Sequence, residues 1–256
     1  RMNRSAKYIT DLITVLTAKE MKIRYKNNVL GYFWSVLQPL SFALVYFIAF
    51  KIVMRIEMEN YTLFLITGMF PWQWFANSIN ESSNLFISNQ SIIKKINFPR
   101  NTLVIASICN DCIHFMLSIP VIILFFFIYD VPLSINLAWC APLLLILQFT
   151  ITYSISLFIA TINLFFRDMA RLVPILMTFL FFLTPIIYSF DMVPDKYKYL
   201  VSLNPVAPLM VSWRNLFLYG QVNIEYVLIA FGYSMIFLMI GQMTYKKLVW
   251  KFAEVL

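Results

Sequence analysis

The stretch RYKNNVLGYFWSVLQP, residues 24–39, separates a basic segment from a long apolar one. Lysines and arginines crowd the segment before it from Lys19 onward, and no charged residue occurs from 33 to 50. Basic residues next to a membrane span stay on the cytoplasmic side, and aromatic residues gather at the water–lipid boundary. We therefore expect this junction at the cytoplasmic surface of a membrane. Its boundary residues are Arg24, Tyr25, Lys26, Tyr32 and Trp34.

The composition indicates a membrane protein. Of 256 residues, 61% are hydrophobic and 12% are charged, whereas about 25% of a typical soluble domain is charged. The net charge is +8, and the basic residues flank apolar runs rather than forming a block suited to nucleic acid. Anionic lipid headgroups are therefore the expected partners of these charges, and no nucleic acid is expected.

Six apolar runs are long enough to span a bilayer, which takes about 20 residues each. They cover residues 33–53, 62–82, 103–128, 137–165, 172–190 and 224–246. With both termini in the cytoplasm, three quarters of the 20 Lys and Arg residues fall in the inside segments. This bias favours that topology. The sequence thus predicts an all-α integral membrane protein with six spans and a single permease-type domain over 1–256.

The segment before the first span predicts an amphipathic helix. Apolar residues recur at helical spacing between Ser5 and Lys26, opposite a polar face. Because it is too polar to span, we expect residues 1–30 to lie in the cytoplasmic interface, ahead of a six-span core at 31–250.

Two connections stand apart from simple turns. In the cytoplasmic segment 88–100, Ser91 is expected to cap a short helix that Pro99 ends. Its apolar side fits a groove on a soluble partner, and the alternative is an ordinary solvated turn. In the outer segment 190–222, Asn204-Pro205 is expected to start a helix and Gly220 to end it. This helix either re-enters the membrane beside a pathway or lies flat in the interface.

Ionisable residues inside a span are costly and attract functional interpretation. Asp111 and His114 lie three apart in the third run, so they share one helix face. They either line a polar conduit or form a satisfied pair packed between helices, and the second interpretation is favoured. Cys109 and Cys112 lie beside them, but four zinc ligands at suitable spacing are not evident. The sequence predicts no metal site and no catalytic residue.

Aromatic residues make up 18% of the chain. One interpretation is that some rings line a pathway on which the C–H faces of a sugar polymer slide, and the other is ordinary packing or lipid contact. The candidates are Phe42, Tyr46, Phe50, Trp72, Trp74, Phe75, Phe179 and Phe182.

Four stretches together resemble the permeases of ABC exporters of polysaccharide, the O-antigen and teichoic-acid exporter family (Wzm-type). They are RYKNNVLGYFWSVLQP at 24–39, NLFFRDM at 163–169, TPIIYS at 184–189 and LNPVAPLMVSWRNLFLYG at 203–220. The resemblance covers nearly the whole chain. It implies six spans, a homodimer, and two copies of a separate ATPase that binds ATP and Mg. It further implies movement of a lipid-linked polysaccharide outward across the bacterial inner membrane.

The resemblance also implies roles for the segments described above. The N-terminal helix becomes an interface helix that touches the ATPase. The coupling residues become Ser91, Ile92, Ile93, Lys94, Lys95, Ile96 and Phe98. The outer gate becomes Asn204, Pro205, Trp213 and Arg214.

Two alternatives stay open. One is a permease of the same architecture for a small lipid or drug. The other is an intramembrane enzyme acting on lipid-linked sugars, for which Asp111 and His114 are the candidate acid and base. None of the five glycines begins a GxxxxGK[ST] phosphate loop. The expected source of ATP hydrolysis is therefore another chain, and no cofactor is expected on this one.

Overall fold

In the computed structural model, residues 2–25, 30–55 and 57–255 are described, and within these ranges the regular structure is entirely helical. The bounds of the α-helices are α1 Met2–Tyr25, α2 Trp34–Tyr46, α3 Tyr61–Ser82, α4 Leu85–Ser88, α5 Gln90–Lys95, α6 Asn101–Ile128, α7 Asn136–Phe165, α8 Met169–Leu183, α9 Lys198–Ser202, α10 Ala207–Tyr219, α11 Ile224–Leu248 and α12 Phe252–Val255. A π-helical segment, η2 (Phe47–Val53), continues α2. Short 3₁₀ turns cover Gly31–Phe33, Phe190–Met192, Asp195–Tyr197 and Val249–Lys251.

Each of the six expected apolar runs contains a helix, so the expectation of an all-helical membrane protein is confirmed. Among the described residues, four segments are long and apolar enough to cross a membrane: 36–53, 101–128, 136–165 and 224–251. The α8 helix is shorter and apolar. The α3 helix has 22 residues, and a large part of it is buried inside the protein.

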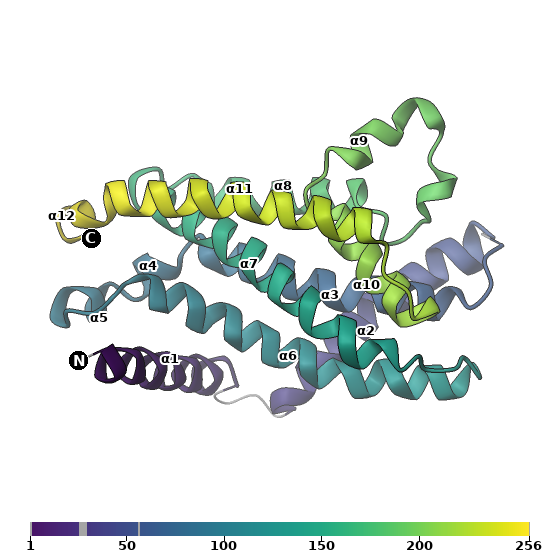
Figure 1. The fold of residues 1–256 in the computed structure, drawn as a ribbon, viewed down its shortest axis with the longest axis horizontal. Coiled ribbons are helices and arrows are strands. Elements are labelled where there is room, and N and C mark those ends of the chain that lie inside the picture. Colours follow the sequence, from purple (N-terminus) through teal and green to yellow (C-terminus); the bar gives the residue numbers. More distant parts are fainter. Residues whose placement is uncertain (1, 26–29, 56, 256) are drawn as a thin grey trace.

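The run 172–190 does not stay helical to its end, contrary to expectation. The α8 helix ends at Leu183, and Thr184 is extended with ψ 132°. Thr184 precedes Pro185, and a proline disfavours the helical conformation in the residue before it. The chain from 184 to 206 then forms an arm with short helical turns around α9, at one end of the molecule (Figure 1).

The α3 helix forms the centre of the bundle. It packs against α2, α6, α7, α8 and α10. Its side chains Leu63, Phe75 and Ile79 are fully buried. Pro71 lies inside α3, and proline is tolerated in membrane helices because neighbouring groups satisfy the freed backbone. The central position of α3 means that its faces contact most of the features described below.

The two ends of the described chain lie at the same end of the bundle, together with α4 and α5 (Figure 1). We call this the terminal end. There α1 packs on α6, and the Thr17 hydroxyl donates a hydrogen bond to the Ala106 carbonyl over 3.4 Å. The N-terminal helix expected from the sequence is present, and its position at a membrane surface stays a prediction.

Near the C-terminus, the Phe252 ring is fully buried. Its centroid lies 5.1 Å from that of Phe86 in α4 and 6.0 Å from that of Tyr245 in α11. The Arg100 guanidinium lies 5.5 Å from the Phe252 centroid and donates a hydrogen bond to the Val249 carbonyl. These contacts fix the C-terminal segment to α4, to α11 and to Arg100, the residue before α6.

Candidate functional site

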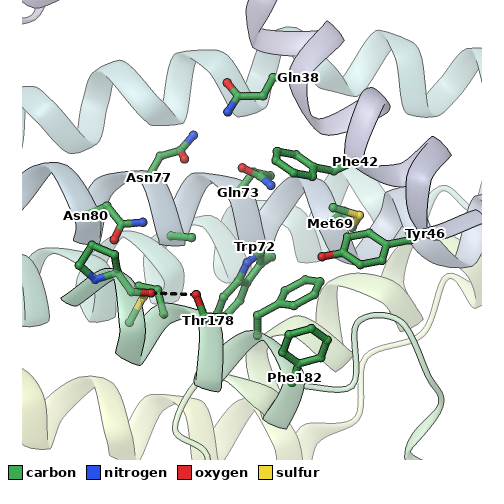
Figure 2. A pocket seen from close by; sticks show the side chains of 14 residues that line it. Gln38, Phe42, Tyr46, Met69, Trp72, Gln73, Asn77, Asn80, Thr178 and Phe182 are labelled. Carbon is green, nitrogen blue, oxygen red and sulfur yellow. Dashed lines mark hydrogen bonds between the residues drawn. The ribbon is translucent and has the colours of Figure 1, made fainter. Parts of the chain in front are cut away.

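A cavity of about 360 Å³ lies between α2, α3 and α8. We call it the amide–aromatic groove (Figure 2). Its lining residues are Gln38, Phe42, Tyr46, Met69, Trp72, Gln73, Ala76, Asn77, Asn80, Pro174, Met177, Thr178, Phe181 and Phe182. The α2 contributions recur every fourth residue, so one helix face supplies them. The same holds on α3 for Met69, Gln73 and Asn77.

The lining separates into two parts along the groove. Figure 2 shows the amides of Gln38, Asn77 and Asn80 toward one end and the rings of Tyr46 and Phe182 toward the other. Every residue that the structure places in the lining is uncharged. Amide groups both donate and accept hydrogen bonds. The groove therefore offers hydrogen bonds and ring faces to an occupant without favouring either sign of charge.

The aromatic part is held together by Phe181. Its ring centroid lies 5.4 Å from that of Tyr46 and 5.7 Å from that of Trp72, so it joins α2 to α3. Centroid separations of this size are typical of favourable ring pairs. In the amide part, Asn80 Oδ1 is buried and has no hydrogen-bond partner within the described residues. A buried acceptor of this kind favours binding of a donor, either water or ligand.

Of the aromatic residues singled out from the sequence, Phe42, Tyr46, Trp72 and Phe182 line the groove. Phe50 lies beside Tyr46, with centroids 6.2 Å apart. The others lie elsewhere. Trp74 stacks on Phe115 in the core, Phe75 is fully buried, and Phe179 is 65% exposed. Periodicity marked the helices correctly, but it did not distinguish the groove face of α8 from its outer face.

Sequence reasoning missed Phe181 and all the amides. A usable signal exists: Gln73, Asn77 and Asn80 recur at i, i+4 and i+7 within an otherwise apolar run. Polar residues on one face of a membrane helix indicate a face that avoids lipid.

The short α5 helix and the three residues after it have two different sides. Ile93 and Phe98 are buried in the protein, while Lys94, Lys95 and Ile96 are exposed and Ile92 is half-buried. Such a division leaves a mixed basic and apolar surface at the terminal end of the bundle. Arg100, next along the chain, is drawn inward toward Phe252.

The expected cap of this helix is wrong. Ser91 lies inside α5. The residue directly before the helix is Asn89, and its side chain makes no capping hydrogen bond to the helix. The helix also ends at Lys95, because Ile96 is extended with ψ 134°. Asn89 instead links α5 to α1: Lys19 Nζ donates to Asn89 Oδ1 over 2.7 Å. The N-terminal helix thus contacts the start of α5 directly.

The sequence pattern of the family described as ABC-2 type transporter matches residues 11–218. The O-antigen export system permease protein RfbA of Klebsiella pneumoniae is 43% identical over 256 residues, which are 100% of this chain and 99% of the relative. The protein of the same name from Myxococcus xanthus is 29% identical over 208 residues, 80% of each chain. The polysialic acid transport protein KpsM of Escherichia coli is 22% identical over 217 residues, 82% of this chain and 83% of that protein.

The chain belongs to the ABC-2 type transporter family. It is a multi-pass membrane protein and the transport component of its system rather than the ATPase. An ABC-2 type permease works with an ATPase subunit.

In this ABC-2 type permease, the break after α8 is held by side chains from other helices. Arg214 Nη1 donates to the Pro185 carbonyl over 2.6 Å, and Nη2 donates to the Ile186 carbonyl over 2.7 Å. The Tyr61 hydroxyl donates to the next carbonyl, Ile187, over 2.8 Å. Non-helical backbone inside a membrane protein must be satisfied in this way. We call this arrangement the carbonyl clamp.

Two of the residues expected at an outer gate, Asn204 and Arg214, lie at this clamp, whereas Trp213 donates a hydrogen bond to Gln148 of α7. Asn204 Nδ2 donates to Thr184 Oγ1 over 2.8 Å, and Arg214 Cζ lies 3.7 Å from the centroid of the Phe64 ring. The expected helix start is wrong, because α10 begins at Ala207 with Pro208 in its first turn. The Asn204 side chain accepts a hydrogen bond from the Val206 backbone N–H and does not cap α10. Pro205 also lies before the helix begins. The expected stop at Gly220 is confirmed by its left-handed φ of 61°.

The polar residues of α6 lie inside the bundle. Asp111 is buried and its Oδ2 accepts a hydrogen bond from the Ser78 hydroxyl of α3 over 2.6 Å. His114 is half-buried one turn further on. Within the described residues, no group of three His, Cys, Asp or Glu side chains is placed to hold a metal.

Of the expected boundary residues, Lys26 lies outside the described residues, as do the side chains of Arg24, Tyr25 and Tyr32. Trp34 begins α2 and is 45% exposed.

Proposed function

We propose that this chain is the membrane subunit of an ATP-driven exporter that moves a lipid-linked polysaccharide of the O-antigen type out of the bacterial cytoplasm. The observation that carries the proposal is the 43% identity to an O-antigen export permease across the full chain. The ATPase would be a separate subunit that binds ATP and Mg, in two copies against a homodimer of this chain.

The amide–aromatic groove supports a glycan as the transported molecule. Sugar hydroxyls both donate and accept hydrogen bonds, which is the capacity of the Gln73 and Asn77 amides. The C–H faces of sugar rings pack on aromatic rings such as Tyr46 and Trp72. A neutral lining with several weak contacts permits an uncharged polymer to advance without being held at one position. In a homodimer, the second copy would complete the wall of this pathway.

We propose a topology of six spans with both termini in the cytoplasm of the producing cell. The helices α2, α3, α6, α7, α8 and α11 would be the spans, and the charge bias of the connections supports this orientation. The terminal end would then face the cytoplasm, where Lys94 and Lys95 of α5 and the following Ile96 would contact the ATPase. The arm at 184–206 and the α10 helix would face outward and, with the carbonyl clamp, form the outer gate.

The decisive experiment reconstitutes the permease with its ATPase in vesicles and measures export of lipid-linked polysaccharide. A Gln73→Leu, Asn77→Leu double variant should lower export by about tenfold, the effect of losing two hydrogen bonds of about 0.5–1.5 kcal/mol each. Tyr46→Leu with Trp72→Leu should act in the same direction. Basal ATP hydrolysis should persist, because neither pair lies on α5.

Phe179→Leu is the matched control, since Phe179 lies on α8 but is exposed away from the groove. Normal export by both groove variants would refute the assignment of the pathway. A permease for a small lipid or drug would instead show ATP hydrolysis stimulated by drugs and unaffected by lipid-linked glycan. Asp111→Asn tests the enzyme alternative: full export by this variant eliminates an acid–base role for Asp111.

A further inference from the structure

A second cavity, of about 500 Å³, lies between α6, α7 and α10 at the end of the bundle opposite the chain termini. Its described lining residues are Met116, Ile119, Ile122, Ile123, Leu133, Ser134, Ile135, Leu137, Ala138, Ala141, Pro142, Leu145, Trp213 and Phe217. Ser134 is the one residue with a hydroxyl in that described set. We call this cavity the apolar groove.

This lining offers a water molecule almost no hydrogen-bond partners. Engineered apolar cavities of about 150 Å³ stay dry and take up hydrocarbon ligands such as benzene. An empty cavity would leave its lining without packing partners, which costs stability in proportion to its volume. Hydrocarbon is therefore the occupant that this lining favours.

The position of the groove identifies the source of that hydrocarbon. Both α6 and α7 are long and apolar enough to cross a membrane. Leu133, Ser134 and Ile135 of their connection line part of the groove, and we call this part its mouth. Ile135 at the mouth is 80% exposed, and Trp139, one turn later on α7, is 81% exposed. Exposed tryptophans mark the level of lipid headgroups. The mouth therefore opens where a phospholipid tail begins.

The rim of the groove is fixed rather than loose. Asn136 Nδ2 donates to the Gly220 carbonyl over 2.8 Å, which ties the α6–α7 connection to the end of α10. Gly220 has a left-handed backbone, and a Cβ there would lie 2.1 Å from the Ser134 Cβ. The floor lies deep, since Trp213 and Phe217 are 1% and 3% exposed. The volume of about 500 Å³ is about that of one α-helical turn with its side chains, so the cavity suits a flexible acyl chain better than a helix from another protein copy.

We propose that a phospholipid acyl chain from the adjacent membrane leaflet occupies the apolar groove and packs on Trp213. The contact extends further inward: Trp213 Nε1 donates to Gln148 Oε1 over 2.6 Å, and Gln148 Nε2 donates to the Pro71 carbonyl over 2.7 Å. Pro71 directly precedes Trp72 of the amide–aromatic groove. The acyl chain thus packs on Trp213 of α10, which is linked through Gln148 to Pro71 in the middle of α3. This inference does not depend on the transported molecule.

The test uses the permease co-purified with its ATPase, in vesicles of phosphatidylethanolamine and phosphatidylglycerol. A small share of the phosphatidylethanolamine carries a photoreactive diazirine on its acyl chain. After illumination, adducts are mapped by peptide mass spectrometry. We expect them within 116–123 and 137–145. Ala141→Phe should lower these adducts by at least about tenfold, because a phenyl ring overfills an occupied site.

Leu143→Phe is the matched control, because Leu143 lies on the same helix, is 47% exposed and is not part of the lining. It should leave the groove adducts unchanged. If Ala141→Phe fails to fold, Ala138→Leu replaces it.

Four results would overturn the proposal. The first is adducts that persist at wild-type levels in the filled variants. The second is adducts confined to outward residues such as Ile146. The third is a second copy of the chain cross-linked over the mouth. The fourth is loss of the adducts on adding a polyprenyl phosphate, which would assign the groove to a polymer carrier.

Discussion

Arg214 and Gly68 approach so closely that a Cβ at Gly68 would lie 2.5 Å from Arg214 Nη2. Only a glycine on α3 leaves room for the guanidinium to reach the Pro185 and Ile186 carbonyls. Gly68→Ala should therefore displace Arg214 and lower the free energy of unfolding by about 1–3 kcal/mol, the usual cost of overpacking. The thermal midpoint of the purified permease measures this change.

Gly232→Ala is the matched control for that substitution. Gly232 lies inside α11 with open space around its Cα. Alanine favours helices over glycine by about 0.5–1 kcal/mol, so the midpoint should stay level or rise. A fall of equal size in both variants would contradict the close approach.

The carbonyl clamp should depend on the shape of Arg214 and not on its charge alone. Arg214→Lys keeps the charge but loses the planar fork that binds two carbonyls at once. Each carbonyl left unpaired costs about 1–3 kcal/mol, so the thermal midpoint should fall clearly. Lys196→Ala, on the exposed part of the arm, should not change the midpoint. An unchanged midpoint in Arg214→Lys would show that the clamp does not stabilise the protein.

Two isoleucines of the α5 region should respond in opposite ways to aspartate. Ile93 is 5% exposed, so Ile93→Asp should destabilise the permease by about 2–5 kcal/mol and lower its yield. Ile96 is 57% exposed, so Ile96→Asp should leave stability within about 0.5 kcal/mol.

The second substitution should instead uncouple ATP hydrolysis from export, if α5 contacts the ATPase as proposed. Paired assays of hydrolysis and export in the same vesicles measure this effect. Normal export with Ile96→Asp would exclude Ile96 from the contact.

The buried ring at the C-terminus should anchor the terminal end. Phe252→Ala removes the contacts with Phe86, Tyr245 and Arg100, and burial of a phenylalanine is worth about 3–5 kcal/mol in such substitutions. The variant should melt earlier and be trimmed faster by a protease acting on the C-terminus. Trp250→Ala, whose side chain is 64% exposed, serves as the control. Equal trimming of both variants would show that Phe252 does not anchor the tail.

Sequence reasoning predicted the helices well because apolar runs and membrane thickness determine where they occur. It located Gly220 as a helix end because the left-handed position there favours glycine. It failed where the deciding partner is distant in the chain. Nothing near Arg214 indicates that its guanidinium binds carbonyls 28 and 29 residues earlier.

The candidate site was predicted only in part for the same reason. Helical spacing placed Tyr46 and Trp72 on plausible faces, but the groove forms only when α2, α3 and α8 come together. Phe179 and Phe182 are equally aromatic and three residues apart, yet only Phe182 faces the groove. The packing of α8 against α3 determines which face of α8 points into the groove. A single sequence does not reveal that packing.

The carbonyl clamp also bears on how the protein is made. The ribosome synthesises the chain from its N-terminus, so the end of α8 leaves the exit tunnel before Arg214 does. Arg214 lies 29 residues after Pro185. During that interval, the Pro185 and Ile186 carbonyls lack the donor that satisfies them in the finished molecule. Unpaired carbonyls are costly in hydrocarbon. This segment should therefore wait at the aqueous surface or in the insertion machinery, and settle into place only once α10 has been synthesised.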